Sequence, residues 1–133
     1  MMVRLCLMSA VLALAAGSAL AKPAPAKAAA PKGDAVAGKT YFDQQCALCH
    51  SAKAGQEGAA PSLFKVYGRK AASDAGFPAY SKALKASNLS WTSANLDKWL
   101  AGPTTLVPGA NMPINVGAAA DRKNLVAYLA TVK

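Results

Sequence analysis

The five residues Cys46-Ala47-Leu48-Cys49-His50 constrain the fold of this chain more than any other part of its sequence. The two thiols stand three residues apart, so a single helical turn brings them to the same side. This spacing, with a histidine directly after it, is the attachment signature for c-type haem. The two thiols can add to the two vinyl groups of one porphyrin, and the adjacent imidazole can reach its iron. The pattern predicts one haem c held by Cys46 and Cys49, with His50 as a metal ligand.

Three other uses of these residues are weaker. A thioredoxin-like redox pair is expected between a strand and a helix, and the surrounding sequence lacks that context. A structural zinc site usually needs four protein ligands, whereas the chain after residue 21 has two cysteines and one histidine. A plain disulfide between Cys46 and Cys49 is conceivable in an oxidising compartment. Haem attachment is favoured because His50 follows the two cysteines directly.

The first 21 residues resemble a secretory signal peptide. Arg4 supplies a positive start, Leu5 to Ala16 form an apolar run, and Ala19-Leu20-Ala21 is a small-x-small cleavage pattern. The run is shorter than the roughly 20 residues needed to cross a bilayer. We therefore predict cleavage after Ala21 and a periplasmic location. The alternative is an uncleaved segment that would tether the protein to the membrane.

The rest of the chain divides into a tether and one domain. Residues 22–33 contain only Ala, Pro, Lys and Gly, a composition typical of a partly extended linker. The globular domain is predicted over residues 34–133. Basic residues exceed acidic ones there, but lysines and aromatic side chains are not interleaved on any one segment, so nucleic-acid binding is disfavoured.

The domain is predicted to be all-α with long loops. Asp34 is a plausible N-cap for a first helix, whose Gly38, Phe42, Cys46 and Cys49 would share one face. Alternating strand patterns are almost absent. Three later helices are expected, and the first covers Tyr80–Ala86. The second is capped by Ser90 or Thr92, ends at Gly102-Pro103, and has Leu96, Trp99 and Leu100 on its apolar face. The third covers Ala118–Val132.

Met112 is the candidate for the second metal ligand. If the signal peptide leaves, the other three methionines leave with it, and His50 is the chain's single histidine. Met112 lies between Pro108-Gly109 and Pro113, which hold the backbone in a non-helical path. A methionine that only fills a gap in the core is the alternative, but this one lies on no apolar helical stripe. A thioether ligand stabilises ferrous iron and raises the reduction potential.

Beyond these residues, the sequence resembles the class I c-type cytochromes, the family of mitochondrial and bacterial periplasmic cytochromes c. The likeness extends from about Gly38 to Leu129. The matching features are Gly38 and Phe42 at 12 and 8 residues before His50, Pro61, the turn Tyr67-Gly68-Arg69-Lys70, the loop Gly76-Phe77-Pro78-Ala79-Tyr80-Ser81, Trp91, Trp99, the residues Leu125, Tyr128 and Leu129, and the 62-residue separation of His50 and Met112.

The resemblance implies the class I cytochrome c fold, in which helices and long loops wrap around one covalent haem. It implies that the Pro61 carbonyl accepts a hydrogen bond from the His50 imidazole and that Trp99 lies near the sulfur ligand. It also implies that the terminal helix crosses the first helix near Gly38. Residues implied to contact or neutralise the haem propionates are Arg69, Tyr80, Ser81 and Trp91.

The chain departs from the mitochondrial pattern around the exposed haem edge. Lysines surround that edge in the mitochondrial proteins and dock acidic partners. The corresponding positions here are neutral and include Thr40, Gln45, Thr104, Thr105, Asn111, Ala118 and Ala119. We therefore expect partner docking to depend less on salt than docking steered by a ring of charges.

The predicted function is single-electron transfer in a periplasmic respiratory or photosynthetic chain. With His50 and Met112 both bound to iron, no coordination position stays open for a substrate, so an enzyme is not expected. The expected partners are redox proteins: a quinol-oxidising complex, an oxidase, a reductase or a photosynthetic centre. The protein itself is expected to be a monomer. One alternative is a dedicated electron acceptor of a periplasmic dehydrogenase. Another is a haem enzyme or gas sensor in which Met112 dissociates.

Overall fold

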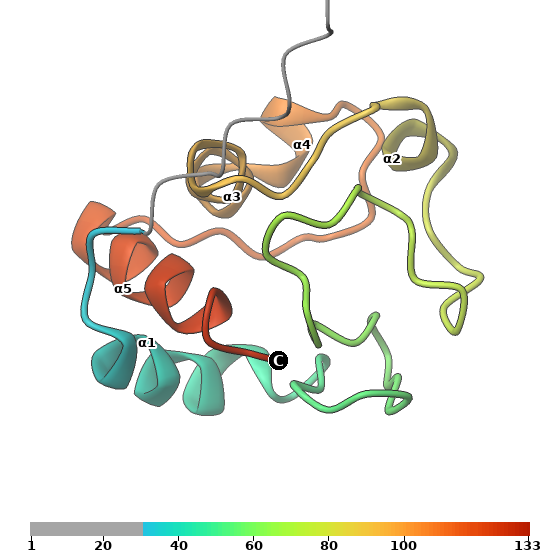
Figure 1. Ribbon diagram of the computed structural model, residues 1–133. Coiled ribbons are helices and arrows are strands. Elements are labelled where there is room, and N and C mark those ends of the chain that lie inside the picture. The colour runs from blue at the N-terminus through green and yellow to red at the C-terminus, as the bar shows by residue number, and fades with distance from the viewer. Residues whose placement is uncertain (1–30) are drawn as a thin grey trace, which may run out of the picture.

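The structure, a computed structural model, describes residues 31–133. The predicted signal peptide and residues 22–30 of the predicted tether lie outside this range. Regular structure in the described part is helical (Figure 1). Its β pairing amounts to one isolated bridge, between Lys70 and Ser90. The all-α prediction is confirmed.

The first helix, α1 (Ala35–Tyr41), begins where the sequence predicts. The Asp34 carboxylate accepts hydrogen bonds from the backbone N–H groups of Val36 and Ala37, at 2.8 and 3.2 Å. These bonds satisfy two of the backbone donors that have no partner at a helix start.

A π-helical turn, η1 (Phe42–Cys46), follows α1 without a break. The prediction of one regular helical face through Cys49 is therefore wrong. The helix ends at Cys46, and Cys49 lies in the turn after it. The backbone N–H groups of Cys49 and His50 both return to the Cys46 carbonyl, at 3.1 and 2.9 Å. Single π turns of this kind are frequent at functional sites.

The next helix, α2 (Lys82–Ala86), is shorter than the predicted range of Tyr80–Ala86. The Ser81 hydroxyl accepts a hydrogen bond from the backbone N–H of Leu84 at 3.1 Å. Ser81 is thus the N-cap, with extended backbone, and Tyr80 precedes the helix.

Thr92, one of the two predicted caps, starts α3 (Ser93–Ala101) by accepting a hydrogen bond from the N–H of Asn95. The helix ends at Gly102 as predicted. A short further helix that was not expected from the sequence, α4 (Pro103–Leu106), begins immediately afterwards. Proline suits the first helical position, since it lacks the N–H that would have no partner there.

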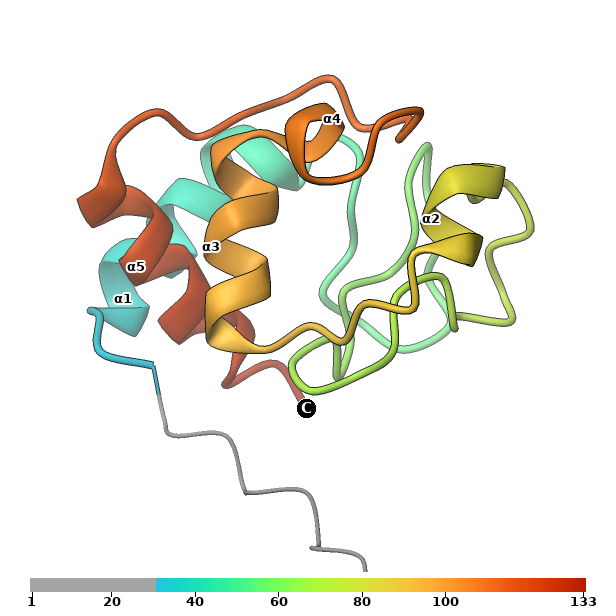
Figure 2. The ribbon, with the colours of Figure 1, turned by 90° about the horizontal axis from the view of Figure 1, so that it is seen from above.

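The last helix, α5 (Ala119–Leu129), packs against α1, and the two lie side by side in both ribbon views (Figures 1 and 2). Gly38 of α1 allows the close approach, because a Cβ there would overlap the backbone carbonyl of Asn124. The crossing implied by the resemblance is confirmed. A hydrogen bond from the Asp34 backbone N–H to the Asn124 side chain, at 2.9 Å, joins the same two helices.

The hydrophobic core contains side chains from η1, α2, α3 and α5 and from the loops between them. In the ribbon, α1, α3 and α5 lie together, and α2 lies apart from them with its preceding loop (Figure 2). Leu125 is 1% exposed and Phe42 is 3% exposed. Each such side chain stabilises the fold by roughly 1.5–3 kcal/mol through burial alone. Between residues 31 and 133, no helix combines the length and the apolar character needed to cross a bilayer.

Candidate haem site

A largely apolar cavity of about 470 Å³ lies among the helices and loops. Its wall contains residues from η1, α2, α3 and α5, and from three loops. Such a volume is in the range of pockets that hold cofactors. Every site residue predicted from the sequence lines this cavity: Cys46, Cys49, His50, Arg69, Tyr80, Ser81, Trp91 and Met112.

The two cysteines are free thiols on either side of the helix end. Cys46 is half-buried and Cys49 is exposed. Burial raises the pKa of the Cys46 thiol. The thioredoxin-like alternative also lacks its expected strand–helix setting, because the regular structure around Cys46 is helical. Among the described residues, no group of three or more potential ligands of the His, Cys, Asp or Glu type gathers to hold a metal ion.

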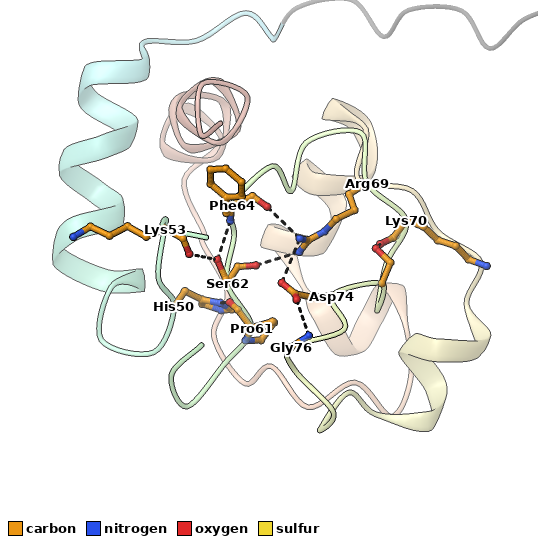
Figure 3. Close-up of polar contacts among 10 residues, drawn as sticks. His50, Lys53, Pro61, Ser62, Phe64, Arg69, Lys70, Asp74 and Gly76 are labelled. Carbon is orange, nitrogen blue, oxygen red and sulfur yellow. Dashed lines mark hydrogen bonds and ion pairs between the residues drawn. The ribbon is translucent and has the colours of Figure 1, made fainter. Parts of the chain in front are cut away.

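His50 is oriented by the loop that follows it. Its Nδ1 lies 2.7 Å from the carbonyl oxygen of Pro61 (Figure 3). A carbonyl only accepts, so Nδ1 donates. Burial lowers the pKa of His50 while the bond to Pro61 acts in the opposite direction, and the neutral ring then leaves Nε2 as an acceptor. The hydrogen bond to Pro61 is confirmed, and it is the kind of contact that fixes a metal-binding histidine.

Met112 is held by α3. The indole N–H of Trp99 donates to the Met112 sulfur at 3.1 Å, as the resemblance implied. Trp99 is itself fixed by an edge-to-face contact with Trp91, with ring centroids 5.2 Å apart. Gly109 turns the preceding backbone with φ +89°, a conformation that favours glycine.

Arg69 is the charged residue of the cavity wall. One terminal nitrogen donates to the Phe64 carbonyl at 3.1 Å and the other to the Ser62 carbonyl at 3.1 Å. The first also meets the Asp74 carboxylate at 3.3 Å (Figure 3). The Arg69 Nε is buried and has no hydrogen-bond partner. A buried donor of this kind costs free energy unless a partner is supplied.

Tyr80, Ser81 and Trp91 reach the cavity from different elements. Tyr80 packs edge-on against Phe77, with ring centroids 5.1 Å apart. Burial raises the pKa of Tyr80, opposed chiefly by the nearby Arg69 charge. The Ser81 hydroxyl already caps α2, and Trp91 is 7% exposed.

Two further residues that were not expected from the sequence support the site. Ser62 is 1% exposed, and its hydroxyl joins the Lys53 carbonyl to the Phe64 N–H. Asp74 accepts from the Gly76 N–H at 3.1 Å and also meets Arg69. The pattern Asp-x-Gly is typical of a side chain that closes a turn on the residue two positions later. This signal could have identified Asp74, but not its second contact with Arg69.

The arrangement fits a haem. Two thiols, an imidazole with Nε2 available, and a thioether line one apolar cavity. The unpartnered Nε of Arg69 is a donor suited to an anionic carboxylate such as a propionate.

Comparisons with known proteins agree with this geometry. The family described as "Cytochrome c" matches residues 35–133. Cytochrome c from Tetrahymena pyriformis is 43% identical over 103 residues, covering 77% of this chain and 92% of its own length. Cytochrome c2 from Rhodomicrobium vannielii is 41% identical over 117 residues, covering 86% and 90%.

A solved structure, cytochrome cH from Methylobacterium extorquens, aligns with a TM-score of 0.67 and 39% identity. The alignment covers 73% of this chain and 97% of that protein. The chain therefore belongs to the cytochrome c family, as an electron carrier with a haem c cofactor.

Proposed function

We propose that His50 and Met112 would be the two protein ligands of the haem iron, and that the protein carries single electrons in a periplasmic respiratory or photosynthetic chain. One observation supports this most: the two side chains line the same cavity, and each has a hydrogen bond that orients it. The bond to Pro61 leaves the Nε2 of His50 available. The bond from Trp99 uses one lone pair of the Met112 sulfur and leaves the other for the metal.

Bound haem supplies reversible one-electron exchange between ferric and ferrous iron. The chain contributes the conditions for that exchange. Buried apolar side chains such as Leu96 and Leu125 exclude water from the cavity. The hydrogen bonds of His50 and Met112 restrain both ligands, so that little rearrangement accompanies a change of oxidation state.

We further propose that Arg69, Tyr80, Ser81 and Trp91 lie against the haem propionates. Two carboxylates in a small protein must be hydrogen-bonded or paired with a charge. Arg69 offers its unpartnered Nε, and Tyr80 offers a phenol whose raised pKa keeps it a donor.

Substitution of Met112 tests the ligand pair. Met112→Ala should leave the haem attached, because both thiols remain, but lower the reduction potential and admit added ligands such as imidazole. Met112→Leu preserves the side-chain volume and separates the loss of sulfur from the loss of packing. Redox titration and ligand titration measure both effects. A wild-type potential in Met112→Leu would exclude Met112 as a ligand.

The periplasmic location is supported by the signal-peptide pattern of residues 1–21. Mass spectrometry of the protein from a host that attaches haem gives both the mature N-terminus and the haem mass. Cleavage after Ala21 supports a freely diffusing carrier. Retention of residues 1–21 would instead indicate a carrier tethered to the membrane through residues 22–33.

A dedicated electron acceptor of one periplasmic dehydrogenase is the second candidate. It is favoured by two exposed apolar side chains near the haem site. Leu48, between the two cysteines, is 82% exposed, and Ile114, on the cavity wall, is 54% exposed. An apolar docking face suits a lasting complex more than brief encounters. Co-purification with a dehydrogenase at equal stoichiometry would support this candidate over a general carrier.

A further inference from the structure

Two arginines of this domain make similar sets of contacts. Arg69 bonds the carbonyls of Ser62 and Phe64 and meets the Asp74 carboxylate at 3.3 Å. Arg122 bonds the carbonyls of Val116 and Gly117 at 3.0 and 2.8 Å, and meets the Asp97 carboxylate at 2.8 Å. Each guanidinium thus bonds two carbonyls of one loop and one carboxylate.

The two arginines differ in what they face. Arg69 lines the haem cavity and keeps a buried Nε without a partner, whereas Arg122 is not part of the cavity wall. Asp74 is also well shielded, with its side chain 16% exposed, against 44% for Asp97. The Asp74 carboxylate is therefore the better shielded of the two, and it pairs with the arginine that lines the cavity.

Asp74 is bound on both of its carboxylate oxygens. Oδ2 meets Arg69, and Oδ1 accepts from the backbone N–H of Gly76 at 3.1 Å (Figure 3). Gly76 begins the loop that leads to Tyr80 and Ser81, so Asp74 joins the arginine to the segment that carries two further cavity residues. Glu57 approaches the same loop at Gly76.

We propose that Asp74 lowers the reduction potential of the haem, because its carboxylate places a negative charge near the iron and shares the positive charge of Arg69 with a propionate. This inference rests on the proposed function only in placing a propionate against Arg69.

The sign follows from elementary electrostatics. Ferric haem carries one more positive charge than ferrous haem, so a nearby negative charge favours the ferric form and lowers the potential. Removing the Asp74 charge removes that preference. It also leaves the guanidinium of Arg69 free to neutralise the propionate more fully, which acts in the same direction. Shielding from water strengthens both effects.

Asp74→Asn, compared with Asp97→Asn, tests the proposal. Both variants remove one carboxylate charge and one Arg–Asp pair, but only the first pair faces the haem. Redox titration of the holoprotein at pH 7 should show an upward shift for Asp74→Asn. The ferrous-to-ferric ratio at fixed ambient potential should change at least about threefold, equivalent to about 30 mV at 59 mV per tenfold for one electron. Denaturant unfolding of the same samples measures the loss of stability separately.

Two further variants complete the test. Asp74→Glu keeps the charge and should retain a potential close to that of the wild type. Asp74→Ser can still accept the hydrogen bond from Gly76 and should reproduce the upward shift, which keeps the test available if Asp74→Asn does not fold. Equal shifts for Asp74→Asn and Asp97→Asn, or none for either, would overturn the role of Asp74. Failure of the wild type itself to take up haem or to titrate as a one-electron couple would instead overturn the proposed function.

Discussion

Trp99 fixes the position of the Met112 sulfur through one hydrogen bond. An indole N–H is a donor only, it is buried here, and the acceptor within reach is the Met112 sulfur at 3.1 Å. Hydrogen bonding draws electron density from the sulfur, so in the proposed ligand pair it would weaken the sulfur as an electron donor to ferric iron. The indole also packs against Trp91, so its position is fixed independently of the methionine.

Trp99→Phe should therefore lower the reduction potential while the haem stays attached. Loss of the hydrogen bond and of part of the buried ring should also cost about 1–3 kcal/mol of unfolding free energy. Potentiometry and denaturant unfolding measure the two effects. The reverse change in potential would mean that the N–H of Trp99 does not act on a ligand sulfur.

Contacts of single side chains were predicted correctly where the residue type itself determines the partner. The contacts of His50 with Pro61 and of Trp99 with Met112 follow from residue type and a family pattern. The contact of Arg69 with Asp74 was missed, because it depends on how a loop without regular structure folds back on itself. Whether Arg69, Tyr80, Ser81 and Trp91 contact propionates stays a prediction, although all four line the cavity.

The crossing of α1 and α5 determines where the first of the two thiols lies. Phe42 and Tyr128 pack at this crossing with ring centroids 5.3 Å apart, and η1 continues from α1 to the first thiol. The position of Cys46 relative to the cavity thus depends on the distance between the two helices. Gly38 sets that distance, since its neighbour across the crossing is the rigid backbone of Asn124 rather than a movable side chain.

Gly38→Ala should destabilise the protein by about 1–3 kcal/mol or more, because the added methyl group forces the helices apart. Gly117→Ala is the matched control: no heavy atom lies within 4 Å of a Cβ there, and it should change stability by less than 1 kcal/mol. Thermal unfolding of the holoproteins compares them. Equal stability of the two variants would contradict the tight crossing.

Capping residues and the apolar periodicity of the sequence predicted the ends of α1, α3 and α5 to within a few residues. The π turn after Tyr41 was not predicted, since the spacing of Phe42, Cys46 and Cys49 also suits a regular α-helix. Helix α4 was missed because Gly102-Pro103 is a stop signal as well as a start signal. The sequence alone does not show that this pair both ends α3 and begins a further helix.

At the scale of the whole molecule, partner docking depends more on where the charges lie than on the net charge. The chain has 15 basic and 6 acidic residues, yet the positions where mitochondrial relatives are expected to carry docking lysines are neutral. Thr104 and Thr105 of α4 are exposed examples. Together with the exposed Leu48 and Ile114, they favour docking through apolar contact.

Electron transfer to a physiological partner should accordingly slow only slightly as added salt shortens the Debye length from about 30 to about 10 Å. Stopped-flow kinetics across that range measure it. Introducing Thr104→Lys and Thr105→Lys together should steepen the dependence with an acidic partner. A steep decline already in the wild type would show that the remaining lysines steer the encounter.

The hydrogen bond between Asp34 and Asn124 joins residues 90 positions apart, and this has a consequence for biogenesis. A growing or translocating polypeptide presents Cys46 and Cys49 long before the segment that covers α1 has emerged. During that interval α5 does not yet cover the segment that carries the two thiols, so both thiols are accessible for haem attachment. The packing of α5 against α1, and the bond from Asp34 to Asn124, can form only once residues 119–129 have been made.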